Sequence, residues 1–142
     1  MLTEKDYCDY ETCVALKELG YVGSSRYYYT QQDRKFHYDA YNKFYTVRTA
    51  DAMGYVLAIH LYEAQKWLRE EKWLFVNVEL FGDYDRDADG KTLGTWVYYS
   101  YGILNTKTAD FIREYDLCAE YQTYEEALSE GVREAVKILK EK

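Results

Sequence analysis

The chain has 142 residues, of which 48% are hydrophobic and 18% aromatic, and it contains 18 tyrosines and no proline. This length is sufficient for a single domain, residues 1–142, with its own core, and the composition excludes a disordered chain. The net charge of −7 disfavours duplex nucleic acid and anionic membranes as partners, because both require a positive protein surface.

Cysteine usage and the lack of long apolar runs predict a cytoplasmic protein without a membrane partner. The three cysteines, Cys8, Cys13 and Cys118, are odd in number and form no C-x-x-C spacing, which is typical of free thiols in a reducing compartment. The segment Met1–Asp6 has no apolar run of the kind found in a signal peptide. No stretch reaches the length of a membrane-spanning helix.

The chain up to Ile59 predicts one helix and three extended segments. The helix is expected over Asp9–Leu19, because Asp9 is a suitable N-cap and Gly20 allows a left-handed end. Gln31–Lys35 is expected to form a turn. The extended segments are rich in residues that favour strands. They are Arg26–Thr30, Lys43–Arg48 and Tyr55–Ile59.

The middle of the chain predicts a helix followed by a strand. Apolar residues recur at helical spacing over Leu61–Glu71. Over Trp73–Phe81, leucine and valine at the even positions alternate with aromatic and polar residues, so one face of this strand should pack on the helices. An aspartate-rich turn is expected over Gly82–Gly90.

The last third predicts two further strands, Gly94–Leu104 and Ala109–Tyr115, and a C-terminal helix. Thr123 and Glu126 form a capping box at the start of this helix, in which each side chain accepts from a backbone amide near the other. Helices that alternate with groups of strands are typical of an α+β domain. We expect a mostly antiparallel sheet of four to six strands with three helices packed mainly on one face.

Several stretches of the sequence are distinctive enough to indicate relatives. They are residues 61–70 (LYEAQKWLRE), residues 123–128 (TYEEAL) with Gly131, and the opening residues 3–8 (TEKDYC) with residues 16–20 (LKELG). Together they resemble a group of small tyrosine-rich proteins from phages and prophages of gut bacteria. The resemblance implies no activity. It implies a context, that of a phage-related accessory protein acting in a bacterial cytoplasm.

The aspartate-rich turn is a candidate metal site. Asp85, Asp87 and Asp89 match the first half of a calcium-binding loop, in which spaced carboxylates supply oxygen ligands. The second half fails, because Trp96 occupies the position of the required bidentate glutamate. Asp89 and Gly90 also form a favourable hairpin turn. We therefore expect a solvated hairpin tip and no cofactor, with a weak calcium site as the alternative.

A basic, tyrosine-rich segment has five basic and two acidic residues between Ser25 and Arg48. Aromatic rings stack on bases and Lys or Arg side chains bind phosphate, so this segment could bind a nucleotide or a short single-stranded nucleic acid. The alternatives are tyrosines that pack in the core and a patch that binds protein. The candidate binding residues are Arg26, Tyr27, Tyr28, Tyr29, Arg34, Lys35, Tyr38 and Tyr41.

A second group of aromatic residues lies on the predicted central strands. Its candidate binding residues are Trp73, Phe75, Trp96 and Tyr98. Such a face is too apolar to remain wet, so the segment Ser25–Arg48, a second copy of the chain in a homodimer, or another protein should cover it. We predict a non-catalytic protein that binds a host protein through this aromatic face and an acidic rim, with nucleotide or single-strand binding as the alternative.

No catalytic motif occurs in the sequence, and we expect no enzymatic activity. The patterns G-x-S-x-G, P-loop and H-E-x-x-H are absent. The two histidines, His37 and His60, have no zinc-ligand spacing to a cysteine. His60 precedes a predicted helix, where its ring can accept from a terminal amide. A Cys–His nucleophilic pair assembled in space stays open.

Overall fold

The computed structural model describes residues 3–39, 41 and 43–141, and of residues 83–85, 93 and 95 it describes the backbone alone. It confirms an α+β fold in which the paired strands are antiparallel. Within these residues the strands form three sheets, of two, three and three strands, where the sequence predicts one. No helix in the described part of the chain is long and apolar enough to cross a membrane.

The N-terminal half combines two small sheets with two α-helices. Its elements are η1 (Glu4–Asp6), α1 (Tyr10–Glu18), β1 (Ser24–Ser25), β2 (Tyr27–Thr30), β3 (Phe36–Tyr38), β4 (Tyr45–Thr46), α2 (Val47–Ala52) and β5 (Tyr55–Leu57). β2 lies between β3 and β5, and β1 pairs with β4. Helix α1 begins where predicted, because the Asp9 carboxylate accepts from the Thr12 amide at 2.8 Å.

The segment predicted as a strand over Lys43–Arg48 is divided between a strand and a helix. Only Tyr45 and Thr46 are extended, and α2 begins at Val47. Thr46 is the cause, because its hydroxyl accepts from the Thr49 amide at 3.1 Å and so caps the helix. The prediction is wrong for the second half of this segment, since alternating apolar residues do not reveal a cap.

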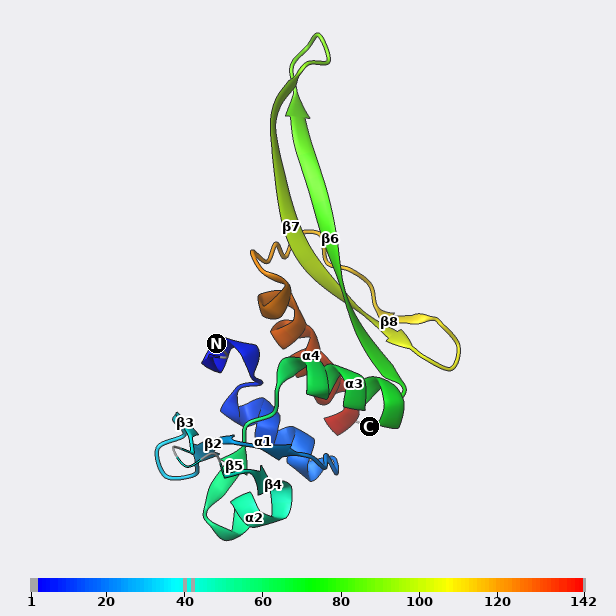
Figure 1. Ribbon diagram of the computed structural model, residues 1–142. Helices are drawn as coiled ribbons and strands as arrows, with labels where there is room; N and C mark the ends of the chain where they lie inside the picture. Colours follow the sequence, from blue (N-terminus) through cyan, green and yellow to red (C-terminus); the bar gives the residue numbers. More distant parts are fainter. Residues whose placement is uncertain (1–2, 40, 42, 142) are drawn as a thin grey trace.

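The C-terminal half is built on a long hairpin. Its elements are α3 (Leu61–Glu71), β6 (Leu74–Arg86), β7 (Thr92–Asn105), β8 (Phe111–Arg113) and α4 (Tyr124–Lys140). β6 pairs with β7 along its whole length, and β8 pairs with the end of β7. The distal part of the hairpin extends away from the rest of the molecule (Figure 1).

The connection between β6 and β7 is shorter than the predicted turn over Gly82–Gly90. The ladder continues as far as Arg86, opposite Thr92. The turn is closed by the Asp87 amide, which donates to the Lys91 carbonyl at 2.9 Å. Glycine and aspartate are unfavourable in strands, but the continuous pairing across the hairpin outweighs this local preference.

The largest part of the core lies between the hairpin and the helices α3 and α4. On β6, Leu74, Val76 and Val78 are buried and face the helices, which confirms the predicted alternation for this part of the strand. Gln65 of α3 donates its side-chain amide to the Val76 carbonyl at 2.7 Å. The buried helix residues of this core are Ala64, Leu68, Ala127, Leu128, Val132 and Ala135.

Gly131 lies where α4 is closest to the hairpin. A Cβ at this position would collide with the Val76 side chain and lie 3.0 Å from Tyr101 Cγ. We expect Gly131→Ala to lower the free energy of unfolding, measured in urea, by about 1–2 kcal/mol, because overpacking costs more than helix propensity returns. Gly94→Ala is the control, since among the described residues no atom beyond its chain neighbours lies within 4 Å of its Cβ. An equal loss in both variants would contradict this expectation.

Buried phenols make the fold sensitive to alkaline pH. Burial raises the pKa of Tyr7, Tyr21 and Tyr101 from 10.0 to about 12. A raised pKa means that the folded state favours the protonated phenol, so this contribution to stability is complete below pH 10 and is lost as the pH rises towards 12. We expect the urea midpoint to fall across that range, together with the appearance of tyrosinate absorbance. A constant midpoint would exclude this coupling.

Candidate protein-binding surface

The distal part of the hairpin, residues 79–99, is called the arm. Opposed residues of an antiparallel pair lie on the same face, so Leu80 with Tyr99, and Gly82 with Val97, continue the face that packs on the helices. The helical cover ends before them, since 56% of Leu80 and 64% of Val97 are exposed. The arm therefore presents an apolar face that nothing in the described part of the chain covers.

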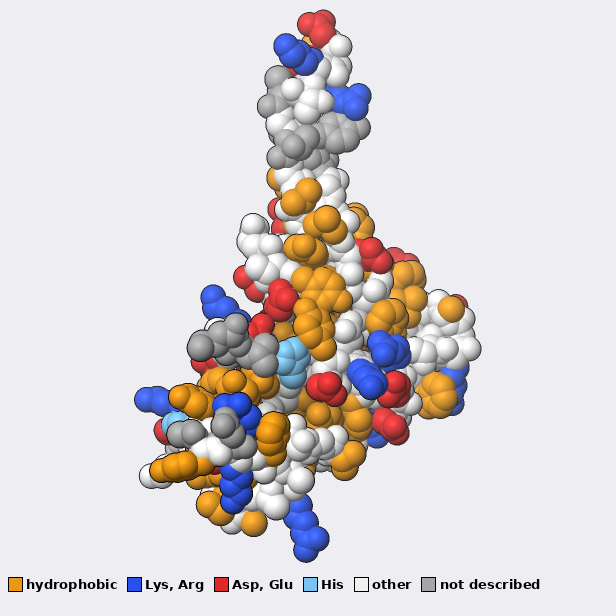
Figure 2. All heavy atoms as spheres, viewed as in Figure 1, with side chains coloured by type: hydrophobic (Ala, Val, Ile, Leu, Met, Phe, Trp, Pro, Cys, Tyr) orange, Lys and Arg blue, Asp and Glu red, His pale blue; other side chains and the backbone are white. Residues whose placement is uncertain are grey.

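Aromatic rings continue this face onto the body of the molecule. The Tyr99 ring meets Tyr124 edge-on with centroids 6.1 Å apart, and Tyr124 lies 6.1 Å from Tyr62. Tyr62 also donates its hydroxyl to the Glu125 carboxylate at 3.0 Å. Figure 2 shows hydrophobic side chains that follow the arm down to the body. The exposed arm residues Leu80 and Val97 and these three rings are together called the aromatic stripe.

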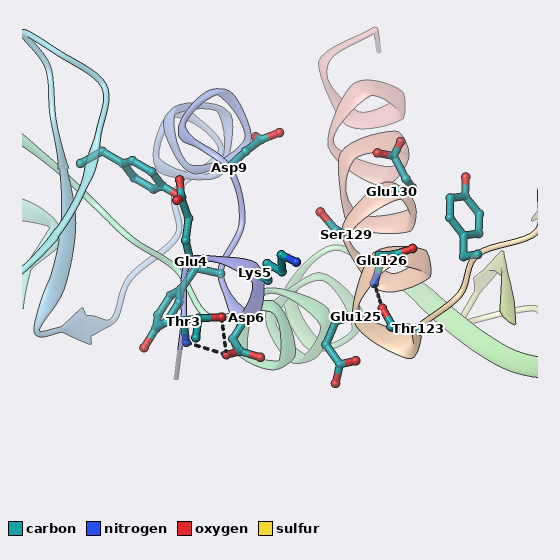
Figure 3. Close-up of a pocket in the computed structure, with 13 residues that line it drawn as sticks. Thr3, Glu4, Lys5, Asp6, Asp9, Thr123, Glu125, Glu126, Ser129 and Glu130 are labelled. Carbon is teal, nitrogen blue, oxygen red and sulfur yellow. Dashed lines mark hydrogen bonds between the residues drawn. The ribbon is translucent and has the colours of Figure 1, made fainter. Parts of the chain in front are cut away.

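An acidic cleft lies beside the aromatic stripe, between η1 and the first turns of α4 (Figure 3). Its volume is about 660 Å³. Glu125 belongs to both features, because it lines the cleft and accepts from Tyr62. Sequence reasoning missed the cleft, because η1 and α4 are far apart in the chain and no local pattern signals their contact. The charged lining residues are six acidic ones, Glu4, Asp6, Asp9, Glu125, Glu126 and Glu130, and one basic one, Lys5.

The predicted aromatic face does not form one patch. Trp73 lies just before β6, at the base of the hairpin, with the Lys107 ammonium 4.4 Å from its ring centroid. Phe75 is half-buried and Tyr98 is buried. Trp96 lies on the arm and is 40% exposed. Of the four predicted residues, Trp96 is therefore the one placed near the exposed apolar residues of the arm.

The face of the hairpin opposite the helices is covered by the segment that follows β7. Tyr115 packs edge-on against Phe81 at 5.4 Å, and its hydroxyl accepts from the Asn77 side-chain amide. Ser100 donates to a backbone carbonyl of the same segment at 2.9 Å. Of the three covers that the sequence leaves open, Ser25–Arg48 is not the one found at these contacts, which are made by the segment after β7.

The tyrosines of the basic segment pack largely against the protein itself. Tyr29 is buried and donates its hydroxyl to a backbone carbonyl of the N-terminal segment at 2.7 Å. Tyr27 stacks on Phe36 with ring centroids 5.3 Å apart. Tyr28 stacks on Tyr55 at 4.1 Å. These rings therefore have the structural role that the sequence leaves open for them.

The remaining candidate residues of this segment lie nearer the surface. Tyr38 and Tyr41 are 60% and 93% exposed, and Lys35 is exposed as well. Arg34 forms an ion pair with a glutamate of α1 at 3.0 Å. The Arg26 guanidinium lies 5.9 Å from the centroid of the neighbouring tyrosine ring. The exposed rings and Lys35 are the part of the segment that is accessible to a ligand.

Two buried cysteines, Cys8 and Cys13, and one histidine have structural roles, whereas Cys118 is exposed. A hydrogen bond with the Cys13 thiol, and then burial, raise the pKa of the Cys8 thiol well above its ordinary value, so Cys8 is a neutral thiol and a weak nucleophile. The His60 ring accepts from the Tyr62 amide at 3.1 Å, which confirms the expected contact. The absence of enzymatic activity stays a prediction.

The aspartate-rich turn uses one of its carboxylates for the turn itself. Asp87 Oδ1 accepts from the backbone amides of Asp89 and Lys91, both at 2.9 Å. The side chain of Asp85 lies outside the described residues. Among the side chains that the structure describes, no group of three or more His, Cys, Asp or Glu residues could hold a metal ion.

We expect calcium to leave the thermal unfolding temperature unchanged, because the Asp87 carboxylate is already occupied by backbone amides. The measurement compares unfolding in millimolar calcium, in magnesium and in a chelator. An ion present at a hundred times its Kd would add about 2.7 kcal/mol to the stability. A rise in calcium alone that Asp87→Asn removes would establish a site.

Comparison with known proteins identifies no relative of this chain. No family model, curated protein or solved structure matches the chain. The likeness to small phage and prophage proteins therefore stays an expectation from the sequence. The residues of the arm, the aromatic stripe and the acidic cleft are the basis for a functional proposal.

Proposed function

We infer that this protein is a non-catalytic binding protein whose aromatic stripe holds a second protein. The observation that carries this proposal is the exposure of Leu80 and Val97 on an arm that extends beyond the core. Large apolar side chains gathered on one exposed face are typical of interaction sites. The resemblance to phage and prophage proteins adds that the partner is a host protein and the chain an accessory factor.

The residues around the stripe are of the types that dominate protein interfaces. Tyr62 is 45% exposed on the body, and Trp96 lies on the opposite face of the arm. Tyrosine and tryptophan provide a large apolar area with a polar tip, and truncating such an anchor costs about 2 kcal/mol or more in binding. Removal of the exposed apolar area from water contributes about 25 cal/mol per Å². Contact along the stripe is therefore favourable.

The charge beside the stripe favours a basic partner. The acidic cleft borders the aromatic rings, and the chain as a whole has a net charge of −7. Complementary potentials accelerate encounter and reject partners of like charge. We expect a partner surface with an apolar centre and a rim of lysine and arginine.

Nucleotide or single-strand binding is the second candidate. The exposed rings of Tyr38 and Tyr41, with Lys35 nearby in the sequence, favour it. Phosphate binding releases counterions and therefore weakens steeply with salt, whereas an apolar interface does not. The charged rim of a protein partner also responds to salt, so substitutions at Tyr41 and Val97 separate the two candidates.

The test compares two exposed valines. Val97→Ser removes apolar surface from the stripe, and Val22→Ser removes it from the loop after α1, where Val22 is 75% exposed. The partner is recovered from a lysate of the bacterial host with the wild-type protein, and its affinity for each purified variant is measured by calorimetry. We expect Val97→Ser to weaken binding about tenfold, equal to about 1.4 kcal/mol, and Val22→Ser to have no effect.

Two results would contradict the proposal. If Val97→Ser binds as tightly as the wild type, the stripe is not the interface. If affinity falls steeply with salt and is lost in Tyr41→Ala but kept in Val97→Ser, the nucleic-acid candidate is correct.

A further inference from the structure

Strand β6 has an open edge along the arm. Its one paired neighbour within the described residues is β7. The outer edge of β7 is partly occupied, because β8 pairs with its end and Tyr99 exchanges two backbone hydrogen bonds with Tyr121, at 2.8 and 3.1 Å. The two edges of the hairpin therefore differ, and the edge of β6 is the one that lacks a partner strand.

The pattern of hydrogen bonds identifies which backbone groups point to this edge. The Val76 carbonyl accepts from Gln65 of α3 at 2.7 Å, so the polar groups of Val76 point away from β7. In an antiparallel pair this orientation recurs at every second residue. The amides and carbonyls of Val78, Leu80 and Gly82 therefore point to the open edge. Tyr99 lies opposite Leu80, and its backbone amide and carbonyl bond to Tyr121 and not to β6, as this assignment requires.

The open part of the edge is limited at both ends. Helix α3 occupies it at Val76 through the Gln65 side chain. The register shifts between Asp85 and Arg86, and such an irregularity disrupts regular pairing. Between these limits the edge has the length of a short strand. The sequence Leu74–Arg86 contains neither proline nor lysine, which commonly protect strand edges from new pairing.

Charge indicates what can occupy this edge. The stretch from residue 79 to residue 89 has five acidic residues and one basic residue, a net charge of −4. A second copy of the chain would bring the same charge against itself, and like charges on neighbouring strands are destabilising. An incoming strand with basic residues is attracted instead. The acidic residues of this stretch in the sequence are Glu79, Asp83, Asp85, Asp87 and Asp89, and the basic residue is Arg86.

The two faces of the arm set the pattern of the incoming strand. Side chains alternate between the faces of a sheet. On the face of Leu80 the neighbours are apolar, and on the other face Glu79 is exposed. The complementary strand therefore alternates apolar and basic residues.

We propose that an extended segment of the partner, with alternating apolar and basic residues, adds as a strand to the β6 edge between Val78 and Gly82. This rests on the proposed function, and it names the part of the partner that the arm binds. Main-chain hydrogen bonds supply affinity in such strand addition, and the alternating side chains supply specificity. The bound arm becomes a three-stranded sheet with Leu80 at its centre.

The experiment uses the full chain and a synthetic peptide of alternating valine and lysine. Its matched control is the same peptide with every amide N-methylated, so that its side chains and charge are kept but neither of its edges can pair with the arm. Amide exchange and chemical shifts are followed by NMR. We expect the first peptide to slow exchange at the amides of Val78, Leu80 and Gly82 about tenfold, and the control peptide to leave it unchanged.

Charge reversal tests the choice of occupant. Glu79→Lys reverses a charge on the arm, and Glu71→Lys reverses a charge at the exposed end of α3. We expect the first variant to weaken peptide binding about tenfold and the second by less than about twofold, because the attraction is local. Both positions are exposed, so both variants should fold.

Three results would overturn the inference. The first is equal binding of the two peptides, and the second is protection of the edge amides by a second copy of the chain at high concentration. The third is a peptide that shifts the side-chain signals of Leu80 and Val97 but leaves exchange at the edge amides unchanged. This third result would overturn strand addition and leave the proposed function intact. If Val97→Ser also keeps full affinity for the recovered partner, the proposed function fails separately.

Discussion

The close packing of α4 on the β6–β7 hairpin determines where the body ends and the arm begins. At Gly131 the helix lies so near the hairpin that a Cβ has no room beside Tyr101. The helix starts at Tyr124, because the Thr123 hydroxyl accepts from an amide of its first turn at 3.1 Å. Tyr124 lies beside Tyr99, and the ladder continues from there without a helix above it. The contact at Gly131 and the cap at Thr123 thus determine where the exposed arm begins.

Two ion pairs join the helix that carries this contact to α1. Arg133 of α4 lies 2.6 Å from the Asp9 carboxylate, and Lys140 lies 2.6 Å from that of Glu18. Each pair is partly exposed and contributes at most about 1 kcal/mol, so its main effect is geometric. The pairs lie where α1 packs beside α4, and η1 lies at the start of α4, so the acidic cleft is between them. The charge that borders the aromatic stripe therefore depends on the same helix as the arm.

Local signals in the sequence were sufficient for α1, α3 and α4 but not for α2 or for the exposed surface. The caps at Asp9 and Thr123 and the alternation along β6 could be predicted, because each depends on neighbours in the chain. Val78 and Leu80 have equivalent places in that alternation, yet 8% of the first and 56% of the second is exposed. This difference depends on where α4 starts. The cover provided by Tyr115 was likewise missed, because it depends on a long-range contact.

In the proposed binding mode, the acidic charge of the arm opposes pairing between the β6 edges of two copies of the chain. Proline and lysine, the common protection of such edges, are absent from β6, and an unprotected edge is a template for aggregation. A net charge of −4 over residues 79–89 opposes pairing between copies of the chain. In the proposal, the same charge attracts the basic strand of the partner. Protection from self-pairing and attraction of the partner then depend on the same acidic residues, and an uncharged arm would lose both effects.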